Sequence, residues 1–158
     1  HVLAEMPDCT GVVTVDGDGQ HRPEYLESMI KKMEEGYDIV IGSRFVGEKK
    51  PFTMRMLGSN LIEMAIRFTT GVNIKDPTSG MRMFSKRMIR EFASGLNYGP
   101  EPDTVSYLIR QGARVAEVPV IMDERILGVS YLTPVNAMRY MLKMLISILL
   151  IQNFRKRR

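Results

Sequence analysis

Two aspartates separated by a single glycine follow a short, β-branched apolar segment near the start of the chain. Residues 11–15 (GVVTV) have the composition of a buried strand, and Asp16 and Asp18 come directly after it. Ligands of open α/β sheets bind at the carboxyl ends of the strands. Carboxylates at positions i and i+2 can both turn toward one hard cation, whose other ligands are usually water and phosphate oxygens. The spacing therefore predicts a site for a metal-bound phosphate, and an Asx turn without a metal is the alternative.

The aspartate pair must be held by the surrounding elements, which alternate along the chain. Apolar runs and turn residues predict further strands and helices. The expected strands are residues 11–15, 38–41, 81–84 and 113–120, and the expected helices are residues 23–35, 55–70, 86–93, 100–111 and 134–153. The first strand, helix and second strand form a β-α-β unit, whose usual geometry is a parallel pair of strands with a right-handed crossover. The order predicts an α/β fold.

The helix expected over residues 134–153 differs from the others in the width of its apolar face. Its polar residues form one narrow stripe: Asn136, Arg139, Lys143 and Ser147. Its uninterrupted apolar run is shorter than the roughly 20 residues that span a bilayer, and four basic residues end the chain, Arg155, Lys156, Arg157 and Arg158. This pattern is typical of a helix on an anionic membrane surface. Docking to a membrane partner subunit, a homodimer and a core helix are the alternatives.

The composition excludes several classes of protein. The chain has 158 residues, of which 44% are hydrophobic and 25% charged, as in a globular domain with a substantial core. Its one cysteine, Cys9, rules out a disulfide-stapled secreted fold. The net charge of +4 comes from the basic end of the chain, without which basic and acidic residues number 18 each. A nucleic-acid-binding domain usually spreads its basic residues over a surface, so we expect no nucleic-acid partner.

Five short blocks follow one another along the chain. They are residues 13–24 (VTVDGDGQHRPE), residues 38–44 (DIVIGSR), Arg55 with Ser59, residues 76–80 (DPTSG) and residues 125–130 (RILGVS). Together they resemble family 2 glycosyltransferases, most closely the branch of dolichyl- and polyprenyl-phosphate sugar synthases. The resemblance implies the later part of a GT-A type, Rossmann-like catalytic domain over residues 1–132. The apolar and basic pattern described above predicts an amphipathic membrane-surface helix and basic tail over residues 133–158. The family's domain begins with a nucleotide-binding half that we do not find here, so we expect a fragment that is inactive alone.

The resemblance also implies roles for polar residues of the first two blocks. Asp18 would bind Mg²⁺ or Mn²⁺ on the diphosphate of a nucleotide-sugar donor, and Asp16 would assist at the metal or at the ribose. Gln20 would contact the donor sugar or the acceptor, or else cap its own loop. Arg44 follows a strand and could clamp phosphate through two hydrogen bonds, or else form a surface salt bridge.

Two further pairs of residues would bind the donor or the acceptor. Arg55 and Ser59 are one helical turn apart and share a face, so together they could hold an acceptor phosphate. A solvated arginine near the start of a helix is the alternative. Arg125 and Ser130 lie in an irregular segment that we expect to be a loop, and they resemble the family's R-x-x-G-x-S motif.

An acidic pair, Glu101 and Asp103, opens the helix expected over residues 100–111. A polyprenyl phosphate is already an anion near pH 7, because its second pKa is about 6, and needs no base. A sugar hydroxyl needs a carboxylate to take its proton. Asp103 is then the first candidate and Glu101 the second, at a position that resembles the base of hydroxyl-using relatives. The structural alternative is that the helix dipole favours acidic residues in a first turn.

The resulting hypothesis is metal-dependent transfer of a sugar, with inversion at the anomeric carbon. The donor is a nucleoside-diphosphate sugar, and the acceptor is a polyprenyl phosphate at the cytoplasmic face of a membrane. Two alternatives stay open. One is a saccharide hydroxyl acceptor with Asp103 as the base, and the other is an inactive, membrane-docking scaffold domain.

Overall fold

The computed structural model describes residues 2–17, 19–48, 50–51, 53–94, 101–123 and 134–151, and only the backbone of Met54, Arg55 and Pro134. In this part of the chain four strands form a mixed sheet: β1 (Gly11–Thr14), β2 (Ile39–Ser43), β3 (Arg82–Ser85) and β4 (Val115–Pro119). The helical elements are α1 (Val2–Glu5), η1 (Pro23–Tyr25), α2 (Leu26–Glu34), α3 (Met54–Thr70), α4 (Lys86–Ala93), α5 (Pro102–Arg110), α6 (Pro134–Ile146) and η2 (Ser147–Ile151). The expected α/β class is confirmed, and α1 has no counterpart in the sequence prediction.

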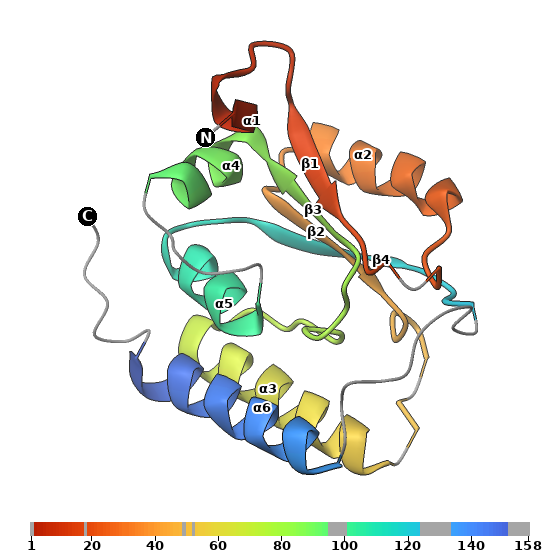
Figure 1. The fold of residues 1–158 in the computed structure, drawn as a ribbon, viewed down its shortest axis with the longest axis vertical. Helices are drawn as coiled ribbons and strands as arrows, with labels where there is room; N and C mark the ends of the chain where they lie inside the picture. Colours follow the sequence, from red (N-terminus) through yellow and green to blue (C-terminus); the bar gives the residue numbers. More distant parts are fainter. Residues whose placement is uncertain are drawn as a thin grey trace.

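The sheet order is β1-β3-β2-β4, with β3 antiparallel to both of its neighbours and β2 parallel to β4. β1 and β2 therefore run in the same direction, but the expectation that they pair with each other is wrong. β3 lies between them (Figure 1), with Phe84 opposite Val12 on one side and Ile39 on the other. The crossover through α2 makes β1 and β2 run in the same direction, but it does not require them to be neighbours in the sheet. The inserted strand supplies hydrogen-bond partners to the facing edges of both β1 and β2.

This strand order brings the ends of several strands to one edge of the sheet. β1, β2 and β4 share one direction, so their carboxyl ends lie at the same edge, and the antiparallel β3 begins there. Arg82, the first residue of β3, is opposite Thr14, the last residue of β1. Asp16 and Arg44, which follow β1 and β2, come to this edge as well. Strand carboxyl ends are where open α/β sheets bind their ligands.

Helices cover both faces of the sheet. Side chains alternate along β2, so Ile39 and Ile41 join the core on the side of α3 and α5, while Val40 joins the core on the side of α2. The sequence of α5 is buried from residue 102 to residue 109. Figure 1 shows the reason, because α5 lies between the sheet and the pair formed by α3 and α6.

The outer layer consists of α3 and α6, which pack side by side. Gly58 allows their close contact, because a Cβ at this position would overlap the side chain of Met141. The α3 helix begins at a Thr53 cap, whose hydroxyl accepts a hydrogen bond from the Met56 backbone N–H at 3.2 Å. It ends at Gly71, whose φ of 76° is left-handed. No helix within the described ranges is both long and apolar enough to cross a bilayer.

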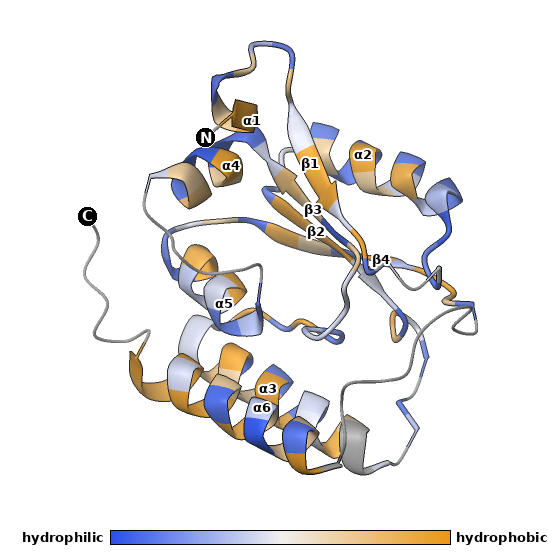
Figure 2. Ribbon diagram, in the orientation of Figure 1, coloured by the Kyte–Doolittle hydropathy of each residue, from blue (hydrophilic) through white to orange (hydrophobic). Residues whose placement is uncertain are grey.

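The helix predicted at the end of the chain has two apolar sides. Met144 and Ile148 are buried and belong to the core on the α5 side of the sheet. Other large apolar residues of α6 and η2 are exposed: Val135, Met138, Leu142, Ile146, Leu149, Leu150 and Ile151. Figure 2 shows hydrophobic segments along the side of the α3–α6 pair that is turned away from the sheet. The helix therefore contributes to the core and still leaves a wide apolar surface.

Candidate active site

A polar cavity of about 400 Å³ lies at the edge where the strand ends converge. Its lining comes from β1 and the loop after it, the turn at residues 76–80, β3, the start of α5, and α6: Thr14, Val15, Asp16, Thr78, Ser79, Gly80, Arg82, Glu101 and Tyr140. Asp16 is exposed, and its carboxylate accepts no hydrogen bond from the residues that the structure describes. Asp18, its predicted companion, lies outside the described residues. The cavity therefore presents a carboxylate whose oxygens remain available to a ligand.

Gly80 makes the space for this carboxylate. A Cβ at residue 80 would overlap the carboxyl carbon and both oxygens of Asp16. The Thr14 hydroxyl lies 3.4 Å from the Gly80 carbonyl oxygen, to which it donates. The end of β1 and the turn at residues 76–80 thus form one wall of the cavity.

A buried ion pair anchors that turn to β2. The completely buried Asp76 carboxylate accepts hydrogen bonds from Arg44 Nε at 2.7 Å and from Arg44 Nη2 at 2.8 Å. These bonds raise the pKa of Arg44, although partial burial opposes them. The Glu117 carboxylate of β4 accepts two backbone N–H groups at the start of the turn, at 2.9 and 2.8 Å. Arg44 is thus committed to a salt bridge through two nitrogens, and its predicted contact with phosphate would use the third, Nη1.

Arg82 brings a buried guanidinium to the cavity. It is 5% exposed, its Nη2 donates to the Pro77 carbonyl at 2.7 Å, and its Nε has no hydrogen-bond partner in the described part of the chain. Burial lowers the pKa of Arg82, whereas the nearby charges of Glu101, Asp76 and Asp16 favour its charged form. Sequence reasoning missed this residue. The available signal was a basic residue inside an otherwise apolar strand, directly after the DPTSG turn.

Glu101 and Tyr140 form the side of the cavity nearest α6. The Tyr140 hydroxyl donates a hydrogen bond to Glu101 Oε2 at 2.5 Å. Burial and this hydrogen bond raise the pKa of Tyr140, so the phenol stays protonated near neutral pH. Of the two acidic residues predicted as a base, Glu101 lines the same cavity as Asp16, and Asp103 does not.

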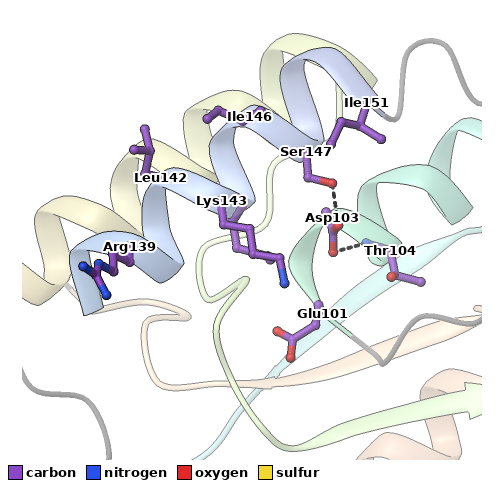
Figure 3. Close-up of a pocket in the computed structure, with 10 residues that line it drawn as sticks. Glu101, Asp103, Thr104, Arg139, Leu142, Lys143, Ile146, Ser147 and Ile151 are labelled. Atoms are coloured by element: carbon purple, nitrogen blue, oxygen red, sulfur yellow. Dashed lines mark hydrogen bonds between the residues drawn. The ribbon is translucent and has the colours of Figure 1, made fainter. Parts of the chain in front are cut away.

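Asp103 lies beside a second cavity, of about 630 Å³, between α5 and α6 (Figure 3). Its walls are formed by Glu101, Asp103, Thr104, Arg139, Leu142, Lys143, Met144, Ile146, Ser147 and Ile151. Asp103 is 6% exposed, and it accepts hydrogen bonds from Ser147 Oγ at 2.6 Å and from the Thr104 backbone N–H at 2.9 Å. The residue that was our first candidate for a base therefore connects α5 to η2. Its role in proton transfer stays a prediction.

The loop after β1 is tied to the segment after β4. Gln20 Nε2 donates to the Asp123 carbonyl at 3.0 Å, and the Asp123 backbone N–H donates to the Gln20 carbonyl at 3.0 Å. Arg22 adds an ion pair with Asp123, with Nε 2.7 Å from Oδ2. These contacts fasten Gln20 to another segment, and its predicted contact with the donor sugar or the acceptor stays a prediction. Arg125 and Ser130, a few residues further on, lie outside the described residues.

Of the predicted pair on α3, the structure describes the side chain of Ser59. Ser59 is 1% exposed, and its hydroxyl is buried without a hydrogen-bond partner among the described residues. The side chain of Arg55 is not among those described. Ser59 does not line the cavity that contains Asp16. The shared acceptor site of these two residues stays a prediction.

The donor atoms at the cavity fit a magnesium-type site. The described residues contain no group of three or more His, Cys, Asp or Glu side chains that could hold a metal ion. Mg²⁺ does not require such a group, because it is usually held by one or two carboxylates and completes its shell with water and substrate phosphates. The available oxygens of Asp16, beside a cavity large enough for a phosphate, match this requirement.

Comparison with known families matches this site to one class of protein. The family model described as glycosyl transferase family 2 matches residues 9–93, a range that contains β1, Asp16, the turn at residues 76–80 and Arg82. The chain belongs to glycosyl transferase family 2.

Relatives within the family agree with the branch expected from the sequence blocks. The chain is 32% identical over 139 residues to the polyprenol monophosphomannose synthase of Mycolicibacterium smegmatis, which covers 84% of this chain and 52% of the relative. It is 28% identical over 120 residues to the dolichyl-phosphate hexose transferase of Haloferax volcanii, covering 75% and 53%. It is 32% identical over 126 residues to the undecaprenyl-phosphate mannosyltransferase of Micrococcus luteus, covering 75% and 51%. The chain spans about half the length of these curated relatives. The resemblance to polyprenyl-phosphate sugar transferases is confirmed.

Proposed function

We propose that the protein containing this chain transfers a sugar from a nucleoside-diphosphate sugar to a polyprenyl phosphate. The observation that carries the proposal is the cavity at the strand ends, where the available carboxylate of Asp16 shares one space with the buried guanidinium of Arg82. A carboxylate that can hold a divalent cation, next to a fixed positive charge, suits a diphosphate leaving group. The names of all three relatives contain polyprenol, dolichyl phosphate or undecaprenyl phosphate, which supports this class of acceptor.

Asp16 and, from their spacing, Asp18 would hold a divalent cation, Mg²⁺ or Mn²⁺. When bound, the cation supplies Lewis-acid stabilisation of the negative charge on the leaving diphosphate. The chain's own residues position the carboxylate. Gly80 leaves it room, and the ion pair between Arg44 and Asp76 holds the turn that carries Gly80. An orientation set in this way before the substrate arrives avoids reorganisation during the reaction.

The proposed transfer exchanges one bond at the anomeric carbon for another. A bond forms to an oxygen of the acceptor, and the bond to the diphosphate oxygen breaks, with its electron pair leaving on the nucleoside diphosphate. Attack opposite to the leaving group inverts the anomeric configuration. This inverting outcome is the expectation that the family resemblance implies.

A polyprenyl phosphate acceptor requires no general base, because its phosphate is already ionised near pH 7. The environment of Asp103 supports this acceptor over a saccharide hydroxyl. Its carboxylate is buried, accepts a hydrogen bond from Ser147 and does not line the cavity that contains Asp16. Asp103→Asn separates the two acceptor classes. Near-normal transfer is expected for a lipid phosphate, and a loss of several orders of magnitude would favour a hydroxyl acceptor with Asp103 as the base.

We also propose that the enzyme is a peripheral protein at the cytoplasmic face of a membrane. Exposed apolar residues recur along α3 at helical spacing: Leu57, Leu61, Met64 and Phe68. The packed neighbour α6 has its own exposed apolar stripe, so the two helices offer a continuous apolar surface. Residues 126–158 contain six basic residues and no acidic residue. An apolar helix surface with excess positive charge suits an anionic leaflet, where a polyprenyl phosphate is also anchored.

The reaction can be tested with membranes that contain the full-length protein. They are incubated with labelled nucleotide sugars, Mg²⁺ or Mn²⁺, and a polyprenyl phosphate, and the lipid extract is counted. We expect label in the lipid that is lost on chelation and in Asp16→Asn. Asp8→Asn is the matched control, because Asp8 is exposed and lies away from the cavity lining. Label in an added saccharide instead of the lipid would favour the hydroxyl acceptor, and no transfer with any donor would favour the inactive scaffold.

A further inference from the structure

Arg82 is a buried charged residue of the active-site cavity, and the reaction proposed above uses it only as a positive charge near Asp16. It lies in the sheet between β1 and β2, where its backbone is opposite Thr14 and Ile41. Its side chain is 5% exposed and lines the cavity together with Asp16 and Glu101. A guanidinium at such a position needs an explanation, because arginine is almost never fully buried unless it is paired.

The protein itself supplies few hydrogen-bond acceptors to the N–H groups of this guanidinium. Nη2 donates to the Pro77 carbonyl at 2.7 Å, but Nε is buried without a hydrogen-bond partner among the described residues. Arg82 forms no ion pair with another described residue. The negative charges of Glu101, Asp76 and Asp16 act on it without a hydrogen bond to it. Burying a charge with incomplete pairing is strongly unfavourable, so a ligand that completes the pairing would bind well here.

The charges of the cavity indicate what kind of ligand this is. Two carboxylates, Asp16 and Glu101, line it, and alone they would repel an anion. The positive charges of Arg82 and of a divalent cation at Asp16 would together outweigh the two carboxylates, so that the cavity would attract an anion. The planar guanidinium donates parallel hydrogen bonds that fit the spacing of phosphoryl oxygens. The cavity, at about 400 Å³, has room for a phosphate or a diphosphate.

We infer that Arg82 is an anion-binding residue of this cavity and that it donates hydrogen bonds to the phosphoryl oxygens of a substrate. The inference rests on the proposed sugar transfer, which it deepens by naming a residue for its phosphate chemistry. Two groups in that reaction have this chemistry, the diphosphate of the donor and the monophosphate of the acceptor. Arg82 stays protonated throughout and moves no proton, and its positive charge compensates the negative charge of the phosphate it holds.

The competing explanation is that Arg82 only fastens the turn through its bond to Pro77. Arg82→Lys distinguishes the two roles. The lysine ammonium keeps the positive charge and can donate to the Pro77 carbonyl, but it has no Nε and no planar pair of donors. Arg87→Lys is the matched control. Arg87 also donates to a backbone carbonyl, that of Gly112 at 3.1 Å, but it is outside the cavity lining.

Binding is measured by titration calorimetry on the full-length protein with Mg²⁺ present. Sodium pyrophosphate is the probe for the donor's diphosphate, and farnesyl monophosphate in detergent is the probe for the acceptor. We expect Arg82→Lys to weaken binding of one probe by about tenfold or more while its thermal unfolding stays near that of the native protein. Loss for pyrophosphate assigns Arg82 to the diphosphate, and loss for farnesyl phosphate assigns it to the acceptor phosphate. Arg87→Lys should bind both probes as the native protein does.

Native affinity for both probes in a folded Arg82→Lys protein would overturn the inference, as would a native protein that binds neither probe. A second measurement on the native protein covers the case in which the variant does not fold. The Nε–H NMR signal of Arg82, assigned through bonds from its backbone, should shift on addition of the probe that binds, and an unmoved signal would also overturn the inference.

The experiments can contradict the proposed function and the proposed role of Arg82 separately. Pyrophosphate binding that depends on Arg82, without sugar transfer by the native protein, would leave the anion site standing and contradict the transferase activity. Sugar transfer and probe binding that are both native in Arg82→Lys would contradict the anion site and leave the activity standing.

Discussion

Gly80 lies so close to the carboxylate of Asp16 that a side chain on residue 80 would occupy the space of the carboxylate. Gly80 does not have a positive φ, so the glycine is required here for space and not for backbone conformation. The contact joins the aspartate pair to the DPTSG turn, two blocks that are far apart in the sequence. Each block therefore depends on the other for the shape of the site.

Replacing this glycine should damage function more than stability. In Gly80→Ala the Asp16 side chain must rotate away, and we expect sugar transfer to fall about 100-fold, because small misplacements at a reacting centre have effects of this size. Transfer rates and thermal unfolding would both be measured. Gly71→Ala is the control. Its left-handed backbone makes alanine unfavourable by about 1 kcal/mol, but it meets open space and should keep full activity. Native transfer in Gly80→Ala would contradict the role of this contact.

The ion pair between Arg44 and Asp76 should contribute strongly to folding. Asp76→Asn keeps the size of the side chain but leaves a partly buried guanidinium without its counter-ion, so we expect a loss of about 3 kcal/mol in the free energy of unfolding. Urea unfolding at neutral pH measures it. Glu35→Gln, which removes an exposed ion pair with Lys32, should change the same quantity by less than about 0.5 kcal/mol. Similar small effects for both variants would show that the buried pair contributes no more to the free energy of unfolding than the exposed pair does.

Asp38 should make the protein sensitive to acid. Partial burial works to raise the pKa of this carboxyl, but hydrogen bonds from Arg87, the Arg114 backbone N–H and Ser85 outweigh it and lower the pKa. A lowered pKa in the folded state gives stability that is present at neutral pH. It is lost as the pH falls below about 4, the ordinary range of an aspartate, and through the folded-state value.

Asp38→Asn tests this dependence. We expect it to lose about 1.5–3 kcal/mol at pH 7, as for hydrogen bonds to a charged group, and its stability to fall less steeply between about pH 5 and pH 2. Chemical unfolding at a series of pH values gives both quantities. Asp8→Asn, at an exposed position, should leave the curve unchanged. An unchanged curve for Asp38→Asn as well would mean that other groups control the acid transition.

The exposed apolar surface of α3 and α6 should bind membranes. Phe68 is 85% exposed and Leu142 is 57% exposed, one on each helix. Replacing both with glutamate removes apolar contact worth about 1.5–3 kcal/mol per side chain when fully buried and adds two negative charges. We expect at least a tenfold loss of binding to vesicles that contain anionic phosphatidylglycerol, measured by flotation of the full-length protein.

The control for membrane binding lies on the other face of the sheet. Ile30 of α2 is 48% exposed, and Ile30→Glu should float with the vesicles as the native protein does. If the α3–α6 double variant also floats normally, this surface has another occupant. Size-exclusion measurements would then show whether the surface binds a second copy of the chain.

Much of the local structure could be predicted from the sequence. Apolar spacing along the chain predicted α4 over its full length and α3 to within one residue at its start. The position of Asp16 directly after a β-branched run predicted a ligand site at the end of a strand, and a cavity lies there. Patterns of this kind depend on residues two to four positions apart, so they can be recognised without knowing the fold.

Contacts across the sheet could not be predicted in this way. The β-α-β pattern predicted the direction of β1 and β2 but not the insertion of β3 between them. The choice between Glu101 and Asp103 as a base could not be made from the sequence for the same reason. Helix-start chemistry applies equally to Glu101 and Asp103, and only the packing of α6 leaves Glu101 beside Asp16 while Ser147 covers Asp103.

The sequence by itself therefore determined the four strands, the helices other than α1, the family and the likeness of five blocks to its motifs. Only the tertiary structure decided which residues lie together: the Asp16 carboxylate against Gly80, Arg44 paired with Asp76, and Arg82 in the cavity that Asp16 also lines. The physical reason is that the interaction between two charges depends on their separation and on their removal from water. Both quantities are set by strand order and helix packing, which bring together residues that are distant along the chain.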